Sequence, residues 1–267
     1  MPWKGEKDPY KVWLSEVLLQ QTRVEQGLSY YLKFIERYPT IQQLADANDQ
    51  DVFKLWEGLG YYNRCRNLLF TAREIVQKYL GIFPSEYETI LSLKGIGTYT
   101  ASAISSFCFN LPHAVVDGNV FRVLSRVFGI SLPSDSNEGK FFFHELAAKA
   151  LHKKEPALYN QAIMDFGAVV CKPMLPLCYS CPLNKICKAH KKNIVNELPV
   201  KLKATLKQTR WLSYFIFEAK GKVLLHLRSE KDIWQGLYEF YLIETRANPN
   251  WDKNILINYL HDELDLM

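Results

Sequence analysis

The 267-residue sequence contains no apolar run that approaches the ~20 residues needed for a membrane-crossing helix. It also has no internal repeat and no low-complexity tract, and we expect no signal peptide, which disfavours a solenoid, a disordered tail or a secreted disulfide scaffold. Neither sign of charge dominates, with 33 Lys and Arg against 28 Asp and Glu, so a polyanionic partner is permitted but not required. With 48% hydrophobic residues, the chain can bury one large core or two modest ones, as expected of a soluble intracellular enzyme.

Strand-like alternation is missing from about the first 195 residues. In this part of the chain, apolar residues recur at spacings of three and four. Ile75, Val76 and Tyr79 show this spacing, which is the period of a buried helix face. Short segments such as Tyr38-Pro39-Thr40 separate the periodic stretches and supply N-caps. The pattern predicts helices over Tyr10–Gln26, Leu28–Tyr38, Thr40–Ala47, Asp49–Trp56, Asn63–Leu80, Tyr87–Leu93, Tyr99–Phe107, Asn119–Phe128, Lys140–Leu151 and Pro156–Val170.

The pattern changes after a basic stretch, in which residues 185–210 contain eight Lys or Arg and a single Glu. Trp211–Ala219 and Lys222–Arg228 are rich in β-forming residues and flank Lys220-Gly221, which predicts a hairpin. Trp234–Thr245 predicts a further strand. We therefore expect a helical domain over 1–195, a basic linker over 196–208 and an incomplete α+β domain over 209–267.

The sequence has only six cysteines, and four of them fall within seventeen positions, separated by six, two and five residues. These four are Cys171, Cys178, Cys181 and Cys187. Crowded thiolates bind a soft metal, and four can complete the ligand set of zinc or of a cubane iron–sulfur cluster. Zinc sites usually place two short pairs across a longer loop, whereas this group has one short pair with uneven outer spacings. The spacing therefore favours a cluster once the rest of the chain is considered.

Two glycines separated by one apolar residue lie between predicted helices, in residues 93–101. Such a segment makes a tight turn, and the free N–H groups of the next helix can hold a phosphate. An ordinary turn between helices is the alternative, because Gly-x-Gly alone is weak evidence. An apolar residue before the glycines and Thr-x-Thr-Ala after them are typical of a helix–hairpin–helix DNA-binding element. Its candidate DNA-contact residues are Leu93, Gly95 and Gly97.

Two acidic residues occupy positions suited to acid–base chemistry. Asp117 follows an apolar run and precedes a predicted helix, where it could be a simple cap or a carboxylate at the mouth of a cleft. Glu16 lies inside an apolar helix, with Trp13 and Leu19 among its neighbours on the same face. Unless it reaches solvent, burial should raise its pKa and let it act as a general acid near neutral pH.

The hairpin, the acid just downstream and the Cys-x6-Cys-x2-Cys-x5-Cys loop occur in this order over residues 3–190. In this combination the chain resembles the endonuclease III superfamily of DNA base-excision enzymes. Further segments resemble its adenine DNA glycosylase (MutY type) branch: Pro2-Trp3, PYKVWLSEVLLQQT from Pro9, GLGYY from Gly58 and NQAIMDFGA from Asn160.

The resemblance implies a mainly α fold with two helical lobes, and a [4Fe–4S] cluster held by the four cysteines. It implies a bacterial, cytoplasmic monomer associated with the nucleoid, with no membrane partner. The implied partner and substrate is double-stranded DNA with adenine opposite 8-oxoguanine or guanine.

Cleavage of an N-glycosidic bond needs an acid for the departing base and a carboxylate near the sugar cation. Glu16 is accordingly expected to protonate N7 of adenine, and Asp117 to stabilise the deoxyribosyl cation at C1′. The resemblance adds Trp3 and Gln161 as residues that line the adenine pocket.

Tyr99 indicates the type of reaction. Relatives with lyase activity carry a lysine at this position, and its amine attacks C1′ by a route that a phenol cannot follow. We therefore expect a monofunctional glycosylase that leaves an abasic site, with Asn119 hydrogen-bonded to Asp117 or Tyr99. The thymine-mismatch relatives share the tyrosine but lack an acid matching Glu16. The alternatives are a bifunctional glycosylase and lyase, or a catalytically impaired iron–sulfur DNA-binding fragment.

The target base must leave the duplex before it can react. In the family, the residues that match Gln21 and Tyr61 enter the duplex beside the oxidised guanine, and the match to Thr22 contacts it. Candidates for contact with the DNA backbone, which would supply salt-dependent affinity, are Arg64, Arg66 and Lys94.

Two features depart from the family pattern. Family members usually carry another helix before the Pro-Trp segment, whereas this chain begins at Met1-Pro2-Trp3. Residues 209–245, which include Gly236-Leu237-Tyr238-Glu239-Phe240, resemble the start of a Nudix-like domain that checks for 8-oxoguanine. We expect the rest of that domain to be absent, and the preference for 8-oxoguanine over guanine to be weakened. No Nudix catalytic box is present, so pyrophosphate hydrolysis is not expected.

Overall fold

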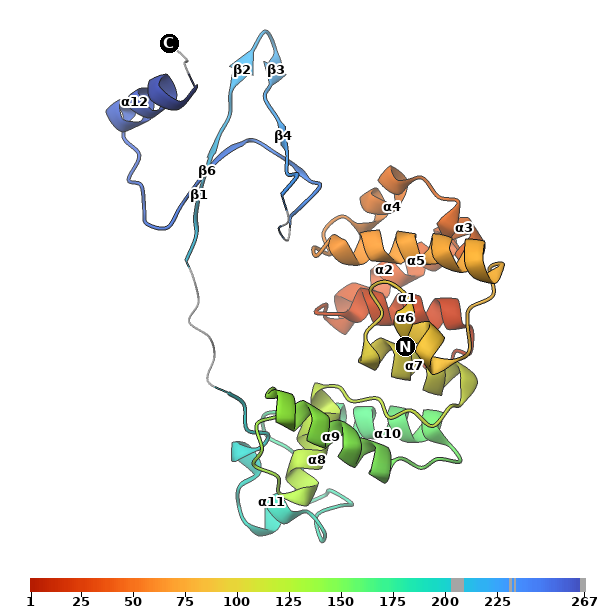
Figure 1. Ribbon diagram of the computed structural model, residues 1–267. Helices are drawn as coiled ribbons and strands as arrows, with labels where there is room; N and C mark the ends of the chain where they lie inside the picture. Colours follow the sequence, from red (N-terminus) through yellow and green to blue (C-terminus); the bar gives the residue numbers. More distant parts are fainter. Residues whose placement is uncertain (203–208, 231, 233, 265–267) are drawn as a thin grey trace. The chain divides into compact units, whose positions relative to one another are not determined.

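The computed structural model describes residues 1–202, 209–230, 232 and 234–264 (Figure 1). The chain divides into two compact units, residues 1–203 and 204–267. The linker expected over 196–208 falls partly on residues 203–208, which lie outside the described residues. Within the described ranges, no helix combines the length and the apolar character that crossing a membrane would take.

The N-terminal lobe of the first unit consists of helices that surround one large apolar core. Its helices are α1 (Pro9–Leu19), α2 (Val24–Arg37), α3 (Ile41–Ala45), α4 (Asp49–Trp56), α5 (Asn63–Tyr79), α6 (Tyr87–Ser92) and α7 (Thr98–Phe109). Trp13, Phe34 and Trp56 are buried in this core. Helix α1 packs against both α2 and α7, and α3 packs against α5. Helix α1 is therefore an inner helix, which explains why its apolar residues are not confined to one face.

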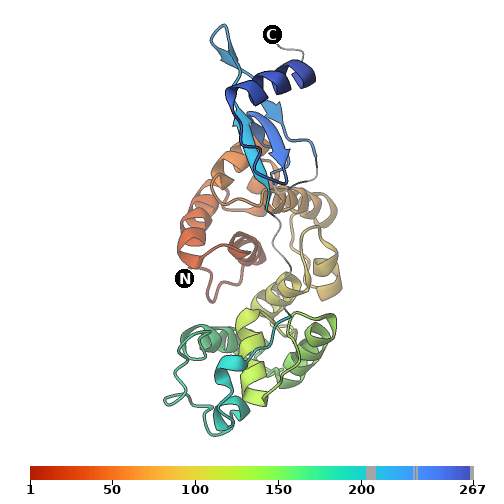
Figure 2. The same cartoon turned by 90° about the vertical axis from the view of Figure 1, so that its left-hand side faces the viewer.

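The second lobe of the same unit, drawn from yellow-green to cyan in Figure 2, is built around a smaller core. Its elements are α8 (Gly118–Phe128), α9 (Asn137–Ala150), α10 (Pro156–Val169), α11 (Lys188–Lys191) and a short 3₁₀ helix, Val195–Glu197. Val120, Leu124 and Phe143 form the centre of this core. Helix α10 packs against α8 and also against α7 of the first lobe. It therefore connects the two lobes.

One predicted helix is wrong. The segment Tyr10–Gln26 is not continuous, because α1 ends at Leu19 and α2 begins at Val24. Between them, Gln21 has a φ of 56°, a left-handed backbone conformation that a helix cannot contain. The apolar spacing continues across this break, so the periodicity does not show it. Helix α4, by contrast, covers its predicted range.

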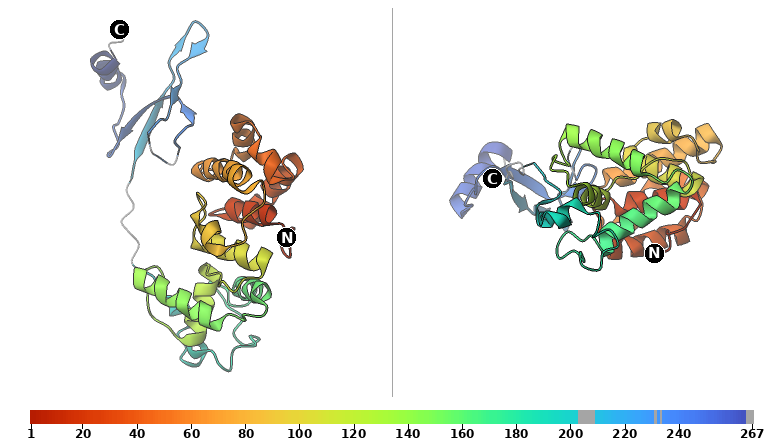
Figure 3. Two further views of the ribbon diagram at one scale, coloured as in Figure 1. Left: turned by 45° about the vertical axis from the view of Figure 1, so that its right-hand side comes forward. Right: turned by 90° about the horizontal axis from the view of Figure 1, so that it is seen from below.

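The strands of the second unit form short antiparallel pairs. They are β1 (Trp211–Phe215) with β6 (Tyr241–Thr245), β2 (Glu218–Ala219) with β3 (Lys222–Val223), and β4 (His226–Leu227) with β5 (Tyr238–Glu239). Figure 3 shows β1 and β6 side by side, with Trp211 opposite Thr245 in the register. The predicted hairpin at Lys220-Gly221 is confirmed, since both residues have the positive φ that two-residue hairpin turns favour.

The predicted strands of this unit are too long. Trp211–Ala219 is divided between β1 and β2, and Trp234–Thr245 is divided between β5 and β6. Helix α12 (Lys253–Leu264) was not predicted. Short strands allow the chain to bend between pairs, and alternation of apolar residues does not record where such bends occur.

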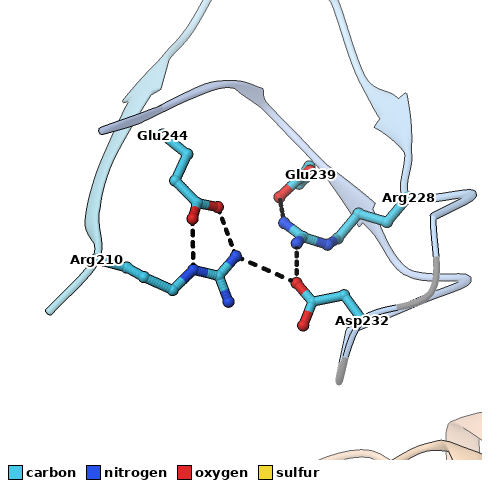
Figure 4. Close-up of polar contacts among 5 residues, drawn as sticks. All are labelled: Arg210, Arg228, Asp232, Glu239 and Glu244. Atoms are coloured by element: carbon cyan, nitrogen blue, oxygen red, sulfur yellow. Dashed lines mark hydrogen bonds and ion pairs between the residues drawn. The ribbon is translucent and has the colours of Figure 1, made fainter. Parts of the chain in front are cut away.

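Two arginines and three acids form a network across the second unit (Figure 4). Arg210 donates to both carboxylate oxygens of Glu244 and also to Asp232, and Arg228 donates to Asp232 and to Glu239. The network connects the β1–β6 pair to the β4–β5 pair. The side chains of Arg228 and Glu239 are only 11% and 13% exposed, so loss of either one would leave a largely buried charge without this partner.

Candidate active site

Glu16 lies on α1, among side chains that are mostly buried. Burial raises the pKa of its carboxyl to about 7, and the nearby carboxylate of Asp117 adds to the rise. A hydrogen bond donated by the Tyr99 hydroxyl opposes it. A carboxyl with a pKa near 7 is protonated in a large fraction of molecules at neutral pH, so Glu16 can donate a proton there.

Tyr99 stands in the first turn of α7, directly after the hairpin. Burial raises the pKa of its hydroxyl far above the usual range, and the charges of Glu16 and Asp117 raise it further. The side chain therefore remains a neutral phenol. It donates a hydrogen bond to Glu16, and it supplies no amine that could form a Schiff base.

Asp117 is the N-cap residue of α8. One of its carboxylate oxygens accepts a hydrogen bond from the backbone N–H of Val120 at 2.8 Å, and the other accepts one from Nδ2 of Asn119 at 2.7 Å. Asp117 is thus a helix cap as well as a neighbour of Glu16, so the two sequence interpretations are compatible. Of the two partners expected for Asn119, the structure shows Asp117.

Arg122 was not identified from the sequence, yet it anchors Asn119. Its Nη2 donates to Oδ1 of Asn119 at 2.7 Å and to the carbonyl of Gly167 at 2.7 Å. Its Nε donates to the carbonyl of Cys171 at 2.7 Å. One guanidinium therefore connects Asn119 with the first residue of the cysteine group. The only signal in the sequence is an arginine within the apolar face of a predicted helix.

Gly167 lets α10 approach this site closely. A Cβ atom placed at Gly167 would lie 2.6 Å from the Cβ of Asn119 and 3.1 Å from its carbonyl oxygen. Contacts that short do not occur without a shift of one partner, so the position requires glycine. The packing of α10 on α8 therefore contributes to the placement of Asn119.

Trp3 and Gln161 lie on segments that an ion pair connects. Nζ of Lys4 contacts both carboxylate oxygens of Asp165, at 2.7 and 2.8 Å. Gln161 lies one turn before Asp165 on α10 and is partly buried. Trp3 packs edge-on against Tyr31, with ring centroids 5.2 Å apart. The two residues expected to line the adenine pocket are thus carried by segments that meet.

The residues expected to enter the duplex lie on two short loops. Gln21 and Tyr61 are exposed, and Thr22 is partly buried. The guanidinium of Arg64 contacts Thr22 and backbone carbonyls of both loops. Arg64 is therefore turned inward rather than toward a phosphate, contrary to the expectation from the sequence. Lys94 is exposed, with its Nζ 4.3 Å from the ring centre of Phe70.

The hairpin between α6 and α7 has the predicted form. Gly95 has a φ of 80°, and a Cβ atom there would lie 2.7 Å from the Cβ of Asn67 on α5. The carbonyl of Lys94 accepts a hydrogen bond from the hydroxyl of Thr71 at 2.7 Å. Gly97 is exposed and no side chain caps α7, which leaves the helix N–H groups for a ligand. The Leu93 side chain is buried, so only its backbone can face DNA.

The four clustered cysteines line one pocket in the second lobe. All four are free thiols. Arg126 lies beside them: its Nη1 is 3.5 Å from Sγ of Cys171, and it donates to the carbonyl of Lys172 at 2.7 Å. Within the described part of the chain, no three His, Cys, Asp or Glu side chains come close enough to hold a single metal ion. The four thiols thus lie together at one pocket, as the sequence spacing predicted.

Comparisons with known proteins define the class to which this fold and site belong. Residues 14–146 match the HhH-GPD superfamily of base excision DNA repair proteins. A thermostable thymine-DNA glycosylase is similar in structure, with a TM-score of 0.66 and 30% identity over 72% of this chain and 88% of that chain. A non-covalent endonuclease III–DNA complex has a TM-score of 0.62 and 25% identity, over 71% of this chain and 87% of that one.

Sequence relatives narrow the class. The adenine DNA glycosylase of Buchnera aphidicola subsp. Baizongia pistaciae is 38% identical over 246 residues, which are 90% of this chain and 68% of that protein. The adenine DNA glycosylase of Homo sapiens is 40% identical over 201 residues, which are 72% of this chain and 37% of that protein. This chain belongs to the adenine DNA glycosylase family.

Proposed function

We propose that this chain is a base-excision enzyme that removes adenine from DNA by hydrolysing its N-glycosidic bond. The observation that carries the proposal is the group of Glu16, Tyr99 and Asp117, in which one carboxyl is held near neutral pKa beside a second carboxylate. Two carboxyl groups with separate environments can divide the roles of acid and cation stabiliser. Family membership identifies the base as adenine.

Glu16 acts as the general acid. Its proton passes to N7 of the flipped adenine while the bond between C1′ and N9 breaks, and the bonding electron pair leaves with the base. The deoxyribosyl cation that remains lies near the side chain of Asp117, which Asn119 and the N-terminus of α8 hold in place. Water then adds to C1′ and returns a proton to Glu16, leaving an abasic site.

Tyr99 keeps the acid in position and limits the reaction to hydrolysis. Its hydroxyl donates to Glu16. Because the side chain is a phenol, it supplies no nucleophilic amine at this position. The product is therefore an abasic site with an intact strand. This distinguishes the enzyme from a glycosylase with lyase activity.

The substrate pairing we propose is adenine opposite 8-oxoguanine or guanine. Gln21 and Tyr61 are exposed on neighbouring loops, suited to fill the space that the flipped base leaves, and Thr22 lies beside them. Gly95 and Gly97 present the hairpin N–H groups to the DNA backbone, which fixes position without reading sequence. The second unit, which we propose is Nudix-like, would add to the discrimination of the oxidised base.

The four cysteines are proposed to hold a [4Fe–4S] cluster. Four free thiols around one cavity supply the donor set that such a cluster requires. When bound, the cluster would supply a covalent crosslink among the segments of residues 171–187. Arg122 and Arg126 attach this loop to α8, the helix that Asp117 caps, so an ordered loop favours an ordered active site.

The test is single-turnover excision on a duplex with one adenine opposite 8-oxoguanine, with alkali to reveal abasic sites. Wild type should cut only after alkali, and Glu16→Gln should lose the reaction. Glu25→Gln is the matched control, because Glu25 is an exposed acid in the first turn of α2. Excision by Glu16→Gln at the wild-type rate would contradict the proposal.

A second measurement separates hydrolysis from lyase chemistry. Borohydride traps a protein–DNA adduct when an amine has attacked C1′. No adduct is expected from wild type. An adduct formed at the same rate as product would assign the chain to the bifunctional class instead.

A further inference from the structure

Arg64, in the first turn of α5, has an unusual set of partners. Within the described ranges, no carboxylate pairs with its guanidinium. Burial lowers its pKa, which expresses the cost of taking this cation out of water. Its partners are backbone carbonyls, one hydroxyl and two aromatic rings. Desolvation of this guanidinium is not offset by a carboxylate partner, so its inward position calls for an explanation other than charge neutralisation.

The contacts of Arg64 converge from two loops that are distant in sequence. On the α1 side, Nη1 donates to the carbonyls of Val17 at 3.0 Å, Leu18 at 3.2 Å and Gln20, and both terminal nitrogens lie 3.4 Å from the Thr22 hydroxyl. On the other side, Nη2 lies 3.4 and 3.5 Å from the carbonyls of residues 59 and 60. The C-terminal end of α1 and the loop before α5 are thus held by one planar group.

The backbone at these loops is strained where it faces the solvent. Gln21 and Tyr61 both have positive φ, 56° and 49°, in a region that non-glycine residues rarely adopt. Such a conformation costs on the order of 1–3 kcal/mol and persists only where its surroundings determine it. Arg64 bonds the carbonyl of Gln20 and reaches that of Gly60, so it contacts the peptide group before each strained residue.

Aromatic contacts complete the arrangement. The guanidinium carbon of Arg64 lies 5.5 Å from the ring centre of Tyr61 and 5.2 Å from that of Trp56. Nε1 of Trp56 also donates to the Gly60 carbonyl at 2.9 Å. A planar guanidinium can stack on rings and donate along several directions at once, which an ammonium group cannot do.

We propose that Arg64 is a positioning residue that holds the loops of Gln21 and Tyr61 in one rigid arrangement, and so determines how strongly excision depends on the base opposite adenine. The inference rests on the proposed function, in which these two residues enter the duplex. Arg64 itself does not touch the reacting atoms. Its loss should leave the acid on α1 intact while the two loops move independently of each other.

The test compares Arg64→Lys with Arg73→Lys. Arg73 is a matched control on the same helix, because it also donates to backbone carbonyls, those of Ala45 at 3.1 Å and Ala47 at 3.0 Å. Single-turnover excision is measured for adenine opposite 8-oxoguanine, opposite guanine and opposite a tetrahydrofuran abasic analogue.

Arg64→Lys should lower the rate opposite 8-oxoguanine by roughly tenfold, comparable to the loss of one hydrogen bond to a charged group, and reduce the ratio of 8-oxoguanine to guanine rates. The rate opposite the abasic analogue should change little, because no opposing base is read there. Arg73→Lys should leave the ratio as in wild type. An unchanged ratio in Arg64→Lys would overturn the inference, whereas an inactive wild type would overturn the proposed function and the inference with it.

Amide hydrogen exchange supplies a readout that does not depend on activity. In Arg64→Lys, residues 20–23 and residues 59–62 should exchange faster together, while Arg73→Lys leaves both segments as in wild type. Faster exchange in only one loop, or in neither, would show that Arg64 does not couple them. If the variant folds but fails to excise any substrate, this measurement still shows whether Arg64 couples the two loops.

Discussion

Replacement of Glu16 by glutamine should stabilise the folded protein at alkaline pH while abolishing excision. Burial raises the pKa of this carboxyl from 4.5 to about 7. A difference of that size between the unfolded and folded states corresponds to about 3 kcal/mol. Glutamine has a similar shape and can accept the hydrogen bond from Tyr99, but it carries no charge to bury. The cost of holding an ionisable acid at the site is therefore measurable as stability.

The sign of the pH dependence follows from proton binding. The folded state binds a proton at Glu16 more tightly than the unfolded state does, so wild-type stability from this group is complete below pH 4.5. It is lost as pH rises toward about 7, where the buried carboxyl ionises. Glu16→Gln lacks this dependence. The stability difference between variant and wild type should therefore widen by about 2 kcal/mol between about pH 5.5 and about pH 8.5.

Urea unfolding followed by far-UV circular dichroism measures this difference, because the helical unit dominates the signal. Glu25→Gln is again the control, and its stability should follow wild type across the range. Wild-type excision should fall as pH rises above about 7, since the acid must be protonated. A stability gap that is the same at both pH values would refute the argument that burial holds Glu16 near neutral pKa.

Further predictions concern the neighbours of the site. Tyr99→Phe removes a hydrogen bond that lowers the pKa of Glu16, so the alkaline fall in the pH–rate profile should move to higher pH; a downward move would contradict the assigned contact. Gly167→Ala should displace Asn119, at a cost of about 1–3 kcal/mol, and reduce the excision rate while leaving DNA affinity unchanged. Rate and binding measurements on the same duplex separate the two effects. Arg126→Gln should lower stability by roughly 3 kcal/mol, because the buried carbonyl of Leu198 and the partly buried carbonyls of Lys172 and Pro173 lose a charged donor. Thermal unfolding measures this loss of stability, and an unchanged midpoint temperature would show that other contacts hold the cysteine loop.

Helix positions were largely predictable because most of the helices bury one apolar face, and burial of one face gives a periodic apolar pattern in the sequence. α4 and α5 follow this record closely. The break at Gln21 does not, since a single left-handed residue can interrupt a helix without disturbing the apolar spacing around it. The apolar alternation likewise does not mark where the predicted strands of the second unit divide.

Two arginines show most clearly what could not be predicted from the sequence. Arg64 was expected to face a phosphate, and Arg122 was not considered, yet both donate to backbone carbonyls inside the protein. Every residue has a carbonyl, so a carbonyl partner has no signature in the sequence. The direction of a long cationic side chain is decided by which carbonyls the fold leaves without a donor.

The sequence by itself determined the helical class, the group of four cysteines, the hairpin and the candidate acid, because each depends on residue type and short spacing. Only the tertiary structure decided that Glu16 meets Tyr99 and Asp117, residues more than 80 positions away, when α1 packs against α7. It alone placed Arg122 between Asn119 and the cysteine loop. The pKa of a buried acid depends on what surrounds it in space, so this property arises from packing and not from the helix that carries the residue.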